Sequence, residues 1–62
     1  MGYSEVDDLL TVQEVAARLK LSVLTIYKYI KEGDLPAVEF GGHYRVEKNA
    51  LQGFVKNHRV TH

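Results

Sequence analysis

The 62-residue chain contains no cysteine and no long hydrophobic run, and its formal net charge is zero. Without cysteine it has no disulfide framework and no thiolate metal ligands. Because it lacks both a run of about 18 apolar residues and a signal-peptide pattern, we expect a cytoplasmic protein with no membrane partner. One domain of this size lies near the lower limit for folding unaided and cannot enclose a large pocket. We therefore expect no enzymatic activity, no cofactor and no small-molecule substrate.

The zero net charge argues against a nucleic-acid partner, but the charges are unevenly distributed along the chain. Residues 1–14 contain four acidic and no basic side chains, whereas residues 15–31 contain four basic and no acidic ones. Phosphate groups respond to local charge rather than to the sum over the whole chain. The basic segment is therefore the candidate nucleic-acid surface.

Residues 22–33, SVLTIYKYIKEG, have the features of a short capped helix. Ser22 can cap the N-terminus, and Gly33 can take the left-handed conformation that follows a last turn. The apolar residues recur at the i, i+3, i+4 and i+7 spacing of one helix face, and they are Val23, Ile26, Tyr27 and Ile30. The opposite arc carries Leu24, Thr25, Lys28 and Glu32, with Lys31 and Tyr29 at its flanks. Such a face suits reading of the DNA major groove, and the alternative is a surface helix with solvated lysines.

The preceding segment predicts another helix over residues 12–20. Thr11 and Glu14 have capping-box spacing, and an apolar stripe follows at Val12, Val15, Ala16 and Leu19. Only Lys20 and Leu21 separate the two helices, so the helices must cross steeply. This predicts a helix-turn-helix unit, with a generic helical hairpin as the alternative. We expect Leu21 to be buried in the turn, and Lys20 to take a positive φ where glycine is usual.

Two short β-prone runs flank a Gly-Gly pair at positions 41–42, which predicts a β-hairpin. By alternation, we expect one apolar face to carry Val38, Phe40, Tyr44 and Val46. The other, exposed face should carry Glu39, His43 and Arg45, with Glu39 lying across the hairpin from Arg45. The hairpin must pack on the helices, because an isolated hairpin is barely stable.

A last helix is predicted over residues 48–57, with a buried stripe of Leu51, Phe54 and Val55. The predicted fold class is therefore α+β, a small winged helix-turn-helix with two helices, a two-stranded hairpin wing and a C-terminal helix. This domain should span residues 9–56, between a flexible acidic arm (1–8) and a flexible tail (57–62).

Candidate chemistry is sparse. The three histidines, His43, His58 and His62, do not have the spacing of a structural metal site, which normally has four ligands. No Ser–His–Asp arrangement is indicated, and the Gly-Gly pair precedes a strand rather than opening a helix around a phosphate. We expect neither a metal nor catalytic residues.

Four motifs in order resemble those of excisionase-type, MerR-like helix-turn-helix DNA-binding domains. They are L-T-x-x-E-V-A at 10–16, S-x-x-T-I-Y at 22–27, G-D-L-P-A at 33–37 and G-G-H-Y-R-V at 41–46. The resemblance implies that the second helix enters the major groove and that the hairpin wing touches the neighbouring backbone. It also implies a role as a recombination directionality factor or a transcription regulator. The partners implied are double-stranded DNA, and further copies of the chain on repeated sites or an integrase.

Carried over by position, the resemblance places Ser22, Val23, Thr25 and Lys28 at the groove, Tyr27 facing phosphate and Arg45 on the wing. The full candidate DNA-binding set adds Leu24, Lys31 and His43. The chain departs from the family in carrying Glu39 where a basic residue is common, so its wing is less cationic. The alternative function is a protein-interaction module that uses Leu24 and this neutral wing.

Overall fold

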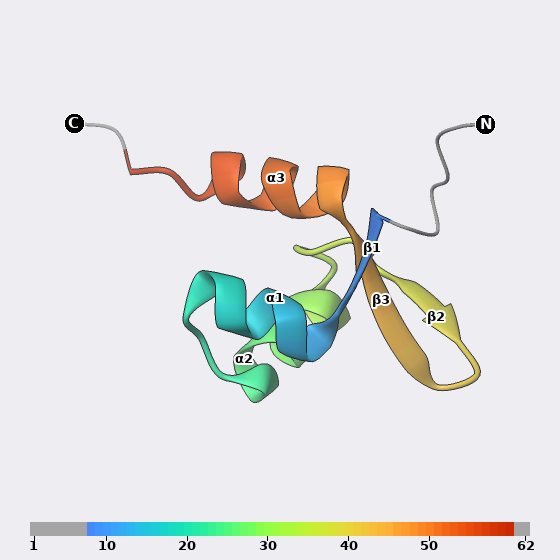
Figure 1. Ribbon diagram of the computed structural model, residues 1–62. Helices are drawn as coiled ribbons and strands as arrows, with labels where there is room; N and C mark the ends of the chain where they lie inside the picture. The colour runs from blue at the N-terminus through green and yellow to red at the C-terminus, as the bar shows by residue number, and fades with distance from the viewer. Residues whose placement is uncertain (1–7, 61–62) are drawn as a thin grey trace.

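The computed structural model describes residues 8–60, so the predicted acidic arm, apart from Asp8, lies outside the described residues. Its elements in order are β1 (Leu9–Thr11), α1 (Val12–Leu19), α2 (Val23–Glu32), β2 (Val38–Phe40), β3 (His43–Glu47) and α3 (Lys48–Asn57). Figure 1 shows α1 and α2 on one side of a small sheet, with α3 above them and the β2–β3 hairpin projecting as a wing. The predicted α+β winged helix-turn-helix is confirmed. Within residues 8–60, no helix has the length and apolar character needed to cross a membrane.

The ends of α1 and α2 follow from local hydrogen bonds. At the start of α1 the capping box is complete: the Glu14 N–H donates to Thr11 Oγ1 (3.0 Å) and the Thr11 N–H donates to Glu14 Oε1 (2.8 Å). The Thr25 N–H donates to Ser22 Oγ at the start of α2 (3.1 Å). Lys20 (φ 59°) and Gly33 (φ 84°) end the two helices in the left-handed conformation. Both predicted left-handed stops are thus confirmed.

Lys20 is the one residue other than glycine with a positive φ among residues 8–60. The left-handed conformation costs a residue with a Cβ about 1–2 kcal/mol, and glycine avoids that cost while losing more entropy on folding. Lys20→Gly should therefore raise the free energy of unfolding by about 0.5–1 kcal/mol, measured by urea denaturation. The matched variant Gly33→Ala should lower it by about 1–2 kcal/mol, since an added Cβ there meets no atom within 4 Å and only the backbone is strained. If Lys20→Gly has the stability of the parent, Lys20 carries no strain.

The sheet contains a third strand that the sequence pattern did not predict. β1 pairs with β3, and the strand order is β1-β3-β2 with both pairs antiparallel. Leu10 lies opposite Val46, and both side chains are buried. A strand of three residues is too short for an alternation pattern to be recognised. Its pairing secures the start of α1 to the central strand of the sheet.

The hairpin turn makes both predicted faces of the hairpin wrong: Val38 and Phe40 share the face of Arg45 and His43, and Glu39 shares the face of Tyr44. Gly41 (φ 53°) and Gly42 (φ 89°) both have positive φ, as in a type I′ turn. A two-residue turn pairs the residues that flank it, so Phe40 lies opposite His43, Glu39 opposite Tyr44 and Val38 opposite Arg45. Residues directly opposite each other share a face. The prediction that Glu39 lies across from Arg45 is therefore wrong, because the turn places these two side chains on opposite faces.

The core lies between the helix pair, the sheet and α3. Its fully buried side chains are Val15, Ile26, Leu35 and Val46. Three predictions of burial are wrong: Leu21 is 42% exposed, Phe40 57% and Val55 39%. Leu21 is held by its backbone instead, since its N–H donates to the Ala16 carbonyl (2.9 Å) across the turn. Phe40 is the last residue of β2 and shares the face of His43, opposite to the face on which Tyr44 contacts Tyr27 of α2.

Candidate nucleic-acid interface

The outward face of α2 carries four exposed side chains, which are Leu24, Lys28, Lys31 and Glu32. Leu24, Lys28 and Lys31 have the spacing i, i+4 and i+7, which places them in one row along the helix that we call the outer stripe, with the acidic Glu32 beside it. Ile26, on the opposite side of the same helix, is completely buried. The helix is thus fixed by one face and presents the other, with two lysines, to the surroundings.

The first turn of α2 is occupied mostly by its own contacts. The hydroxyls of Ser22 and Thr25 hydrogen-bond to each other (2.9 Å), and Ser22 Oγ also accepts from the Thr25 N–H. Val23 is half-buried and packs against the core. Three of the predicted groove residues therefore have structural partners, whereas Leu24 is 80% exposed.

Tyr27 connects α2 to the wing. Its ring meets that of Tyr44 on β3 edge-to-face, with 5.9 Å between the ring centroids. Both tyrosines are half-buried, so each places an apolar ring inward and leaves part of its surface accessible. Tyr44 is not among the residues that the sequence predicts for the site. Its contact with Tyr27 places it where α2 meets the wing, a position that depends on the folding of the chain.

The two wing candidates lie on the other face of the sheet. His43 and Arg45 alternate with Tyr44 along β3, so they point away from the face that contacts Tyr27. His43 is exposed opposite Phe40, and Arg45 is half-buried with its guanidinium donating to the Tyr44 carbonyl (2.9 Å). Glu39 shares the face of Tyr44 and so lies on the α2 side of the wing. The structure thus groups the outer stripe with Tyr27, and separates His43 and Arg45 from them by the thickness of the sheet.

The capping box at the start of α1 changes the pKa of the Glu14 carboxyl group. Its pKa is lowered, chiefly because the Thr11 backbone N–H donates to the carboxylate, and the Thr11 hydroxyl and the positive charges of Arg18 and Arg45 act in the same direction. A lowered pKa means that the folded state favours the ionised carboxylate. This contribution to stability is present above the ordinary glutamate pKa and is lost as the pH falls through the lowered value.

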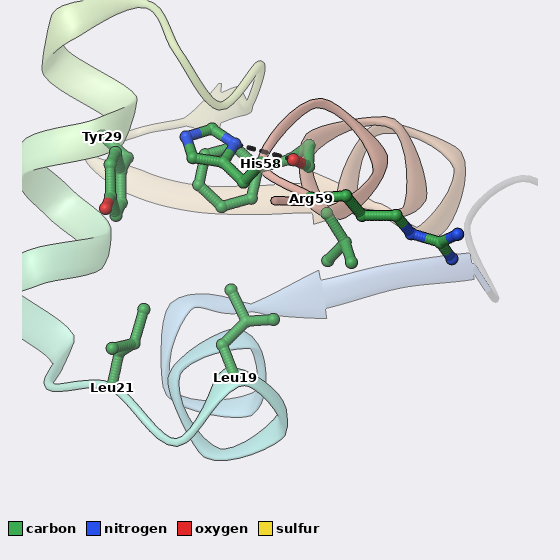
Figure 2. A pocket seen from close by; sticks show the side chains of 7 residues that line it. Leu19, Leu21, Tyr29, His58 and Arg59 are labelled. Carbon is green, nitrogen blue, oxygen red and sulfur yellow. Dashed lines mark hydrogen bonds between the residues drawn. The ribbon is translucent and has the colours of Figure 1, made fainter. Parts of the chain in front are cut away.

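A second surface feature lies between the end of α1, α2 and α3. It is an open cleft of about 300 Å³. Its lining includes Leu19, Leu21, Tyr29, His58 and Arg59, which are labelled in Figure 2. His58 stacks on Phe54 with ring centroids 4.1 Å apart, and its Nδ1 donates to the Phe54 carbonyl (2.8 Å). His58 belongs to the segment 57–62 that the sequence predicts to be a flexible tail, and these contacts join it to Phe54 of α3. The cleft is lined mainly by apolar side chains and includes one permanently charged residue, Arg59, so it carries less positive charge than the outer stripe with its two lysines.

Comparison with known proteins gives matches over nearly the whole chain. A family model described as a helix-turn-helix domain matches residues 9–59. A protein of Mycobacterium tuberculosis, found in two strains and named as a candidate DNA-binding protein, is 38% identical over 55 residues, which cover 89% of this chain and 70% of the relative. The uncharacterized protein YvgK of Bacillus subtilis is 43% identical over 51 residues, which are 82% of this chain and only 17% of the relative. The same unit therefore occurs in a short protein and as a small part of a much longer one.

Proposed function

Because this chain belongs to the helix-turn-helix domain family, we propose that it binds double-stranded DNA with α2 in the major groove. The membership confirms the resemblance to excisionase-type domains stated from the motifs. The relative named as a candidate DNA-binding protein supports the same partner.

One observation carries the proposal: a capped helix, fixed by buried Ile26, presents the outer stripe away from the core. In helix-turn-helix proteins the second helix lies in the major groove with its N-terminal residues near base edges. Leu24 lies in the first turn of α2, and Lys28 and Lys31 follow on the same side. The ammonium groups of these lysines can reach a guanine edge or a phosphate group. Tyr27 lies between α2 and the wing, where a phosphate of the DNA backbone would pass.

The test is a titration of labelled duplex DNA at two salt concentrations. Each neutralised phosphate lowers log K by about 0.9 for each unit of log salt concentration. A DNA-binding surface with a few lysine and arginine contacts should therefore lose affinity steeply between 50 and 200 mM salt, values typical of such titrations. The alternative, a protein-interaction module, would show little affinity for DNA at either concentration.

We propose that binding is sequence-specific and serves recombination directionality or transcription regulation. One short helix reads only a few base pairs, which is too little for selectivity among genomic sites. Several copies on repeated sites, an integrase, or a further domain would supply the missing selectivity. YvgK, in which the matched unit is 17% of the length, is an example of such a unit within a longer protein.

Cooperative assembly predicts a specific footprint. On a duplex that carries repeated sites, protection should spread to all of them over a narrow range of protein concentration. No heptad pattern is present to hold a stable dimer, so sedimentation of the free protein should give the mass of a monomer. Footprints that stay at one isolated site at saturating protein would contradict the assembly, while leaving DNA binding intact.

The wing gives a prediction that follows from the register of the hairpin. Glu39 lies on the α2 side of the wing, where its charge opposes phosphate within a Debye length of about 8 Å at physiological salt. Glu39→Lys should therefore tighten binding and increase the salt slope by about 1–2. Arg45→Ala, half-buried on the opposite face, should weaken binding less than Glu39→Lys tightens it. Any loss should be the same for all sequences, because backbone contacts do not specify bases. If both variants bind as the parent does with equal salt slopes, the wing does not touch DNA.

A further inference from the structure

We infer that Leu24 contacts the 5-methyl group of a thymine in the major groove. Part of the DNA sequence preference would then come from an apolar contact. This inference rests on the proposed function and adds the identity of one base to it. It begins from an exposed leucine in the first turn of α2, whose side chain is 80% accessible.

Within residues 22–25, Leu24 is the exposed side chain that makes no hydrogen bond within the turn. The hydroxyls of Ser22 and Thr25 are engaged with each other at 2.9 Å, Ser22 Oγ also accepts from the Thr25 N–H, and Thr25 is half-buried. Val23 is used in packing. Leu24 also stands in line with Lys28, one turn further along the helix, so a helix that brings Lys28 to the DNA brings Leu24 with it.

The chemistry of the groove then restricts the base. A leucine side chain has no hydrogen-bond donor or acceptor, and the apolar feature among the major-groove edges is the C5-methyl group of thymine. Against guanine, adenine or the cytosine amino group, leucine would displace water from polar atoms without replacing their hydrogen bonds. Thymine is therefore favoured by contact, and the other bases are disfavoured by desolvation.

The experiment removes the methyl group alone. The purified chain selects duplexes from a random pool, and each thymine of the selected site is then replaced in turn by deoxyuridine. Replacement at one position should weaken binding by about fourfold, the effect of losing one buried methyl group. Leu24→Ala should bind the thymine and uracil duplexes equally at that position. Leu24→Gln should shift the preference there toward adenine, which glutamine can bind in a bidentate manner.

Val60→Ala is the matched control, because it truncates another exposed apolar side chain (77% accessible) that lies beyond α3. It should retain the uracil effect in full. A selected site in which every uracil substitution is neutral overturns the inference while the proposed function stands. A uracil effect that is undiminished in Leu24→Ala also overturns it, since another residue then makes the contact. Failure to select any duplex overturns the proposed function and the inference with it.

Discussion

Replacing Ile26 with alanine is expected to lower the free energy of unfolding by about 2–5 kcal/mol. Ile26 is completely buried at the centre of α2, where the helix packs on α1 and the sheet. Removing three methyl or methylene groups leaves a cavity that the surrounding side chains fill only in part. A domain of this length has a total stability of only about 3–9 kcal/mol, so much of the variant should be unfolded at 37 °C.

Urea denaturation followed by circular dichroism measures this effect, with Leu24→Ala as the matched control. The control removes a similar aliphatic side chain from the same helix, but at a position that is 80% exposed. Its free energy of unfolding should stay within about 0.5 kcal/mol of the parent value. Equal losses in the two variants would mean that α2 is not anchored through Ile26, and the assignment of its outward face would then be wrong.

Replacing Lys28 with alanine is expected to weaken specific DNA binding by about 1–3 kcal/mol if its ammonium group contacts guanine. Lys28 is exposed in the middle of the outer stripe, one turn beyond Leu24, so its side chain is free to extend into a groove. If the ammonium group contacts only phosphate, the loss should be smaller and similar on all sequences, and the salt slope should fall by about 1. Titrating the selected duplex and an unrelated duplex distinguishes the two contacts.

Lys56→Ala provides the control for charge. Lys56 is an exposed lysine in the last turn of α3 and is not part of the outer stripe. Its loss changes the net charge by the same amount and should leave the preference between the two duplexes unchanged. If Lys28→Ala binds both duplexes as the parent does while its circular dichroism spectrum is unchanged, Lys28 is not part of the interface.

The helix ends and the helix-turn-helix unit were predictable because their causes are local. The Thr11–Glu14 capping box, the Ser22 cap and the left-handed stops at Lys20 and Gly33 depend on groups within a few residues of each other. The buried face of α2 was predictable as well, because the 3.6-residue period is written in the positions of its apolar residues. These signals determine which side of α2 is outward, and hence the location of its two lysines.

The two-residue Gly-Gly turn specifies the pairing register of β2 and β3, and the register specifies which face each side chain occupies. A two-residue turn requires Phe40 to pair with His43, and this pairing alone fixes the faces of Glu39 and Arg45. The alternation of apolar residues predicts the faces less well here, because β2 has only three residues. The exposure of Phe40 is the consequence of that register and of its place at the wing tip.

Local patterns were sufficient to predict the helix-turn-helix unit, its caps and the outward lysines, since each depends on contacts made within one element or its adjoining turn. The pairing of β1 with β3, the contact of Tyr27 with Tyr44, and the exposure of Leu21 depend on the folded arrangement of the chain. These features join segments that lie far apart in the chain or depend on how much of a surface a neighbouring element covers. No local sequence pattern predicts these contacts or this exposure, because both are set by the packing of all the elements around one core.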